Sequence, residues 1–138
     1  MRGQRWAGVP SGTRVISAAA VAVFGYGTVV HVVQLATGGW DPYPLLPGWL
    51  AAYFLLLAAL DPLAATLLWL RRREGLVLGC AVLVTDAAAN GYANYVLDGS
   101  GGATAGRIGQ AAITALAIAL VAVAPRVWPW FHPTARTH

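Results

Sequence analysis

Four long apolar runs constrain the fold of this chain more than any other feature of its sequence. Each is close to the roughly 20 residues that a helix needs to cross about 30 Å of hydrocarbon. They cover residues 15–35, 49–70, 75–95 and 107–124, with approximate ends. Open strands cannot satisfy their backbone hydrogen bonds in lipid, so each run is predicted to be a helix. We therefore expect an all-α integral membrane protein, a four-helix bundle in which residues 1–138 form one transmembrane domain.

The composition agrees with this class and excludes others. Of the 138 residues 58% are hydrophobic and only 10% are charged, which leaves too little polar surface for a soluble domain of this size. Cys80 is the single cysteine, so neither an intramolecular disulfide nor a Cys-x-x-Cys redox pair can form. No cofactor motif or set of metal ligands is recognisable, and we expect no cofactor and no metal.

The arginines predict the orientation of the bundle. All nine basic residues are arginines, and eight of them precede the first run, join the second to the third, or follow the fourth. These eight are Arg2, Arg5, Arg14, Arg71, Arg72, Arg73, Arg126 and Arg136. With four spans they share one side of the membrane, and Arg107 alone lies opposite. The positive-inside rule therefore predicts that both termini are cytoplasmic, and this placement argues against nucleic acid as a partner.

Local composition favours a multi-pass protein of the cell membrane. The six tryptophans fall near predicted span ends, where amphipathic rings prefer to lie. The connection over 38–49 holds three prolines and two tryptophans and is expected on the membrane interface. The arginine-only, Ala/Gly-rich composition suits a GC-rich bacterial genome, so we expect a bacterial plasma membrane. The run "RRRE" is interpreted as a topology signal that contacts anionic lipid, and "PRVWPWFHP" as an interfacial anchor.

Polar residues recur at helical spacing inside the apolar runs. The stretch "VLVTDAAANGYANY" places Asp86, Asn90 and Asn94 four residues apart, on one slowly drifting helix face. Its small residues would let neighbouring helices approach closely, as expected of an inner helix of the bundle. His31 and Gln34, three apart, also share a face.

In the fourth run, spacings of three and four give Arg107, Gln110 and Thr114 a common face. At a rise of about 1.5 Å per residue, Asp61 lies about 18 Å and Asp86 about 14 Å from the outer ends of their spans. A charge exposed to lipid costs about 2.5–3.5 kcal/mol, so these polar faces are predicted to point inward. The pattern predicts one polar cavity, wettest at its outer side and floored by the two aspartates.

The candidate residues for ligand binding or proton relay are Asp86, Asp61, Asn90, His31, Asn94, Gln110 and Arg107. No catalytic residue is assigned. Each candidate has a structural alternative. Asp86 could be held by Asn or Thr hydrogen bonds, and Asp61 before Pro62 could cap the helix segment that follows. His31 could be a hydrogen-bonded core histidine, and Arg107 could pair with Asp98.

Three functions compete at this level. The first is binding, or help in transport, of a small molecule or lipid in the outward-facing cavity. The second is a membrane enzyme with isomerase-like acid–base chemistry on a lipophilic substrate, which we expect less because no nucleophile or cofactor motif is recognisable. The third is a structural subunit whose polar groups bind a partner helix. The expected partners are membrane lipids, a hydrophobic small molecule, and a second copy of the chain or a membrane-complex subunit.

One stretch carries a family resemblance. Four spans with acidic groups facing inward, and the stretch "PGWLAAYFLLLAALDP" over 47–62, resemble the EXPERA family of sterol isomerases and sigma-2-type receptors. The stretch covers under a quarter of the chain, and its acidic residue, Asp61, is not the family's glutamate. The chain is therefore not assigned to that family, and no residue role is carried over.

Overall fold

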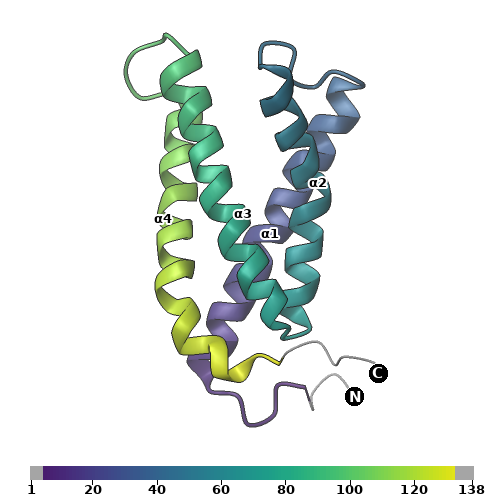
Figure 1. Cartoon of the computed structure of the whole chain (residues 1–138), viewed down its shortest axis with the longest axis vertical. Helices are drawn as coiled ribbons and strands as arrows, with labels where there is room; N and C mark the ends of the chain where they lie inside the picture. The colour runs from purple at the N-terminus through teal and green to yellow at the C-terminus, as the bar shows by residue number, and fades with distance from the viewer. Residues whose placement is uncertain (1–4, 133–138) are drawn as a thin grey trace.

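Four long helices make up most of the protein (Figure 1). The computed structural model describes residues 5–132. The helices are α1 (Ser11–Gly38), α2 (Gly48–Trp69), α3 (Arg73–Tyr92) and α4 (Ala105–Val127). A π-helical turn η1 (Ala93–Leu97) extends α3, and a 3-10 turn η2 (Trp128–Trp130) extends α4. Within 5–132 there is no strand, only an isolated parallel bridge between Arg72 and His132.

The observed helices confirm the all-α, four-helix prediction. Each of the four is long and apolar enough to cross a membrane. The predicted spans agree with the helix bounds to within a few residues, the largest difference being the earlier start of α1 at Ser11. The third run ends in the π-helical turn, which periodicity did not indicate. Arg2 and Arg136, used above to predict the orientation, lie outside the described residues.

The helices run alternately up and down, so the start of α1 and the end of α4 lie at one end of the bundle (Figure 1). We call this end, with the α2–α3 turn, the terminal end, and the opposite end, with the connections 39–47 and 98–104, the loop end. Consecutive helices pack against each other, whereas α1 and α4 make few direct contacts. Towards the loop end the α1–α2 pair separates from the α3–α4 pair (Figure 1).

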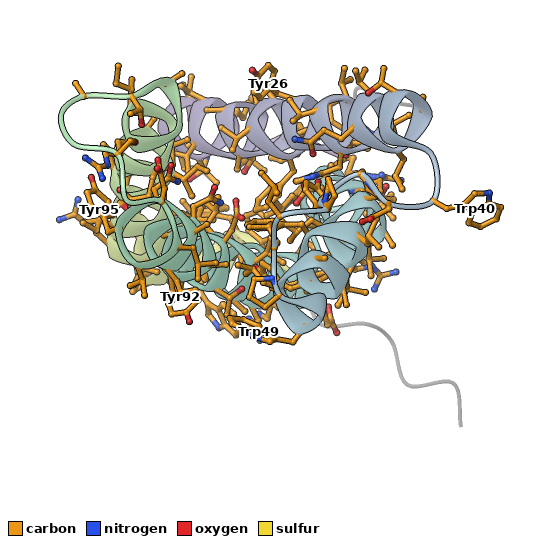
Figure 2. All side chains as sticks on the ribbon, turned by 90° about the horizontal axis from the view of Figure 1, so that it is seen from above. Tyr26, Trp40, Trp49, Tyr92 and Tyr95 are labelled. Carbon is orange, nitrogen blue, oxygen red and sulfur yellow. The ribbon has the colours of Figure 1, made fainter. Side chains whose placement is uncertain are left out.

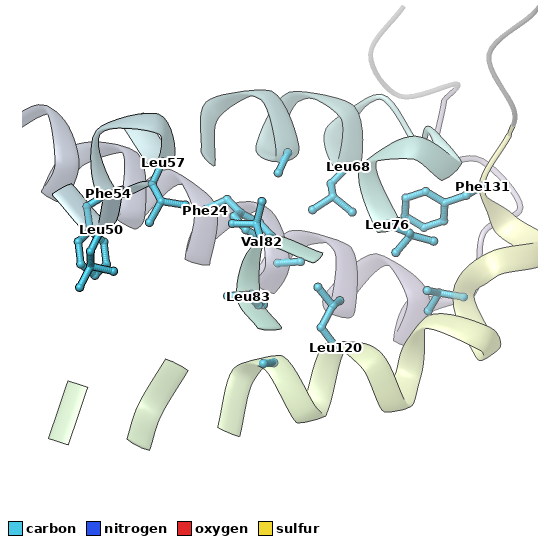
Figure 3. Packing of buried hydrophobic residues seen from close by; sticks show 14 residues of the cluster. Phe24, Leu50, Phe54, Leu57, Leu68, Leu76, Val82, Leu83, Leu120 and Phe131 are labelled. Atoms are coloured by element: carbon cyan, nitrogen blue, oxygen red, sulfur yellow. The ribbon is translucent and has the colours of Figure 1, made fainter. Parts of the chain in front are cut away.

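Buried apolar side chains pack between the helices along the bundle, and several of them lie towards the terminal end (Figure 3). Leu68 of α2, Leu76 of α3 and Leu120 of α4 are all buried there. Phe131, after η2, is only 1% exposed and lies beside Leu76 (Figure 3). The interpretation of 125–133 as an interfacial anchor is therefore wrong for Phe131, which belongs to the core.

Arg71 ties the terminal end together. Its Nε and Nη2 donate to the carbonyl of Trp130 at 2.9 and 2.5 Å, and its Nη1 donates to the carbonyl of Arg5. Its own carbonyl accepts from the backbone N–H of His132 at 2.8 Å. Arg71 is 8% exposed, so reading "RRRE" as only a topology and lipid signal is wrong for this residue. The α2–α3 turn thus holds both terminal segments in place.

Gly75 allows α3 to approach the end of α2, and this predicts the effect of adding one methyl group. A Cβ at Gly75 would lie 2.7 Å from the backbone of both Leu67 and Leu68. Gly75→Ala should lower the free energy of unfolding in detergent micelles by about 1–3 kcal/mol, because backbone must move to make room. The matched control is Gly109→Ala in α4, where a Cβ meets nothing within 4 Å. Equal stability of the two variants would contradict the packing.

Candidate functional site

A cavity of about 550 Å³ lies between the helices in the half nearer the loop end. All four helices and the α1–α2 connection line it, and Figure 2 looks down on this end. Its volume falls in the range typical of small-molecule pockets. Most of the wall is apolar. The polar lining residues are Tyr26, His31, Gln34, Tyr43, Asp61, Asp86 and Asn90.

His31 of α1 and Asp61 of α2 meet across the helix interface. The Nε2 of His31 lies 3.7 Å from the Oδ2 of Asp61. The Nδ1 of His31 lies 3.1 Å from the Oε1 of Gln34, which also accepts a hydrogen bond of 2.5 Å from the Tyr43 hydroxyl. An amide oxygen only accepts, so in this arrangement Nδ1 carries a hydrogen and Nε2 faces the carboxylate. The contact is then an imidazolium–carboxylate pair, or a neutral imidazole facing a protonated carboxyl group.

Gly27 makes room for this contact. Any Cβ at position 27 would collide with the Oδ2 of Asp61, so the carboxyl group lies directly against the backbone of α1. Asp61 is 5% exposed. Because α2 continues through Pro62 to Trp69, Asp61 does not begin a new helix segment, and the capping alternative is wrong.

Asp86 is held by its own helix. The Nδ2 of Asn90 donates to the Oδ1 of Asp86 at 2.8 Å and to the Asp86 carbonyl at 3.1 Å. Both side chains line the cavity, as the four-residue spacing predicted. Both aspartates therefore line one cavity. Asp61 contacts the side chain of His31, and Asp86 accepts a hydrogen bond from that of Asn90.

Asn94 does not continue the stripe into the cavity. Its Nδ2 donates to the carbonyl of Asn90 at 2.8 Å, and its side chain packs against Gly106 at the start of α4. A Cβ on Gly106 would collide with the Asn94 Oδ1, so the missing side chain at Gly106 leaves room for the Asn94 carboxamide beside α4.

Arg107 and Gln110 also lie outside the cavity lining, which corrects the expectation for the fourth run. The Arg107 guanidinium donates to the carbonyls of Asn94, Ser100 and Gly102 and lies 4.9 Å from the Tyr95 ring centroid. It therefore closes the α3–α4 connection. Gln110 donates to the Thr114 hydroxyl at 2.9 Å on its own helix.

Asp98 accepts hydrogen bonds from the backbone N–H and hydroxyl of Ser100 at 2.9 and 2.8 Å. These bonds, and more weakly the charge of Arg107, lower the pKa of Asp98 below its ordinary value. The charge of Arg107 thus acts on Asp98, but the hydrogen bonds of Asp98 come from Ser100, and those of the Arg107 guanidinium go to main-chain carbonyls.

Tyr43 is a polar lining residue whose position the sequence did not indicate. It lies in the connection expected on the membrane interface, yet its hydroxyl reaches Gln34 and its ring packs 5.5 Å from that of Phe54. Burial, and then the Asp86 charge, raise the pKa of Tyr43 above its ordinary value. Nothing in the spacing of a proline-rich connection indicates that one of its rings folds back between the helices.

The glycines of α1 give a test of the His31–Asp61 contact. Gly27→Ala should displace the Asp61 carboxyl group and shift the Nε2 resonance of His31 in ¹⁵N NMR spectra of histidine-labelled protein. Gly25→Ala is the control, since a Cβ there meets nothing within 4 Å and should leave the resonance in place. An unchanged resonance in folded Gly27→Ala would show that the carboxyl group does not depend on this space.

Within residues 5–132, His, Cys, Asp and Glu form no group of three or more that could hold a metal ion. Comparison of the chain with protein-family models, with curated proteins and with solved structures found no match.

Proposed function

We propose that this chain is a multi-pass membrane protein that binds, or helps to transport, an amphipathic small molecule or lipid in its cavity. The observation that carries the proposal is the cavity itself, where seven polar residues from four segments gather inside an otherwise apolar bundle. Buried polar groups are costly unless they have partners, and a row of them facing a ligand-sized space favours a binding role.

The distribution of charge supports a membrane orientation with both termini in the cytoplasm. Of the described arginines, six lie at the terminal end and Arg107 lies at the loop end. By the positive-inside rule the terminal end faces the cytoplasm, and the cavity then lies in the outer half of the bundle. Large apolar side chains are widely exposed on the helices, and lipid would cover them. The composition remains the reason to place the protein in a bacterial plasma membrane.

The lining indicates the chemistry of the ligand. Carboxylate oxygens of Asp61 and Asp86 accept hydrogen bonds, and among the described lining residues there is neither lysine nor arginine. The ligand should therefore have a polar end that donates hydrogen bonds, such as an amine or a hydroxyl group. The apolar wall, formed by residues such as Phe24, Leu83 and Ile113, would hold an apolar body.

One observation favours acid–base chemistry as a second candidate. The His31–Asp61 contact places two proton-exchanging groups 3.7 Å apart beside the cavity. Such a pair could move a proton on a lipophilic substrate, in the manner of an isomerase. Turnover of the bound molecule, lost in His31→Gln while binding persists, would distinguish this enzyme from a binding protein.

The aspartates predict how binding responds to substitution. Native mass spectrometry of protein released from native-lipid nanodiscs should detect a co-purifying small molecule or lipid. Asp61→Asn and Asp86→Asn should each reduce its retention by roughly tenfold or more, the effect of weakening one charge-assisted hydrogen bond. Asp98→Asn is the matched control, because Asp98 lies outside the cavity and should retain wild-type binding. An empty wild type, or equal loss in all three folded variants, would contradict the binding role.

The proposed orientation has its own test. Single cysteines introduced by Ala7→Cys and Ala103→Cys, in a chain with Cys80 replaced by alanine, should differ in labelling by a membrane-impermeant maleimide on intact cells; both alanines are exposed. The cysteine at 103 should react and the one at 7 should react only after permeabilisation, because the charge distribution places them on opposite sides. The reverse pattern would show that the termini face outward.

A further inference from the structure

A second cavity, of about 510 Å³, lies at the terminal end, away from the cavity described above. Arg5, Leu70, Arg71, Arg72 and His132 line it. They come from the segment before α1, the α2–α3 turn and the segment after η2. None of these described lining residues is acidic, three are arginines, and the fourth polar one is a histidine.

Arg71 brings a buried cation to this cavity. A guanidinium has five N–H donors, and three atoms of Arg71 donate to the main-chain carbonyls of Trp130 and Arg5. These carbonyls fix the planar group but carry no net charge, so they leave its positive charge unneutralised. Within residues 5–132 this leaves two of the five donors for another acceptor. Burial, and the nearby charge of Arg5, lower the pKa of Arg71 below its ordinary value.

Arg71 occupies the left-handed position that follows the C-cap of α2, where the backbone N–H of Arg72 donates to the carbonyl of Leu67 at 2.9 Å. Its φ is 56°, in the left-handed region that residues with a Cβ seldom adopt and glycine adopts freely. The side-chain hydrogen bonds offset this strain, and they direct the guanidinium to the place where Arg5 also lies. Like charges that converge on one space are stabilised by an anion between them.

We propose that this arginine-lined cavity binds an anionic phosphoryl group, from a phospholipid head group or from free phosphate. The planar fork of arginine matches phosphate oxygens in two parallel hydrogen bonds, and Arg71 is already fixed in one orientation. The Arg71 guanidinium carbon lies 5.4 Å from the centroid of the Trp6 ring. Tryptophan is enriched at the level of the lipid head groups. The site is separate from the first cavity and does not depend on what that cavity binds.

The test replaces arginines whose side chains do not form the hydrogen bonds between Arg71 and the main chain. Arg5 accepts one of those bonds through its carbonyl oxygen, so Arg5→Gln leaves that hydrogen bond in place. Arg72→Gln is the second variant. Arg126→Gln is the matched control, because Arg126 is exposed at the same end and does not line the cavity. Circular dichroism and thermal melting select the folded variants, and Arg5→Gln alone decides if Arg72→Gln does not fold.

Two arms distinguish the sources of the phosphoryl group. In the first, native mass spectrometry measures retention of phosphatidylglycerol against phosphatidylcholine from an equimolar mixture. In the second, inorganic phosphate is titrated into the detergent-solubilised protein and followed by calorimetry. We expect preferential retention of phosphatidylglycerol, weakened about tenfold in Arg5→Gln and in Arg72→Gln and unchanged in Arg126→Gln.

Each outcome is decisive. Preference for phosphatidylglycerol with this pattern of variants assigns the site to a lipid head group, and phosphate binding alone with the same pattern assigns it to free phosphate. Equal weakening in Arg126→Gln would show diffuse attraction to surface charge and overturn the proposal. Absence of both lipid preference and phosphate binding in the wild type would also overturn it.

Discussion

The closure of the bundle at its terminal end is the constraint on which the remaining structure depends. The Arg71 guanidinium joins the α2–α3 turn to the segments before α1 and after α4, and Phe131 fills the apolar space beside Leu76. Towards the loop end the α1–α2 pair separates from the α3–α4 pair (Figure 1), although the rings of Trp49 in α2 and Tyr92 in α3 still lie 5.6 Å apart there. The bundle is therefore closed at one end and open enough at the other to hold a cavity.

The cost of removing polar side chains from water determines which hydrogen-bond partners they take in this bundle. A polar group away from water needs a hydrogen-bond partner, and this chain meets the need in two ways. Arg107, Gln110 and Asn94 find partners in their own helices and connections, and these bonds shape the α3–α4 unit. His31 and Asp61 find each other across α1 and α2 beside an open space, which leaves them available to a ligand.

The two cavities carry opposite chemistry. The one nearer the loop end presents two aspartates within an apolar wall, whereas the one at the terminal end presents three arginines. In the proposed orientation the basic cavity lies at the cytoplasmic head-group level, where anionic lipids concentrate. The acidic cavity then lies deeper, where a molecule with an apolar body would enter. An anion held at the terminal end would strengthen the same closure that shapes the open end.

The sequence by itself determined the helices and part of each helix face. Apolar runs of about 20 residues predict the four helices, an even number of helices returns both termini to one end, and periodicity pairs Asp86 with Asn90 and His31 with Gln34. Periodicity states which residues share a face, but it does not state how that face is rotated against a neighbouring helix. Only the tertiary structure therefore decided that Asp61 rests on Gly27, that Tyr43 folds back from its connection, and that Gln110 and Arg107 lie outside the cavity. It also decided that Arg71, one of three adjacent arginines, is the buried one, because burial follows from the partners that only folding brings near.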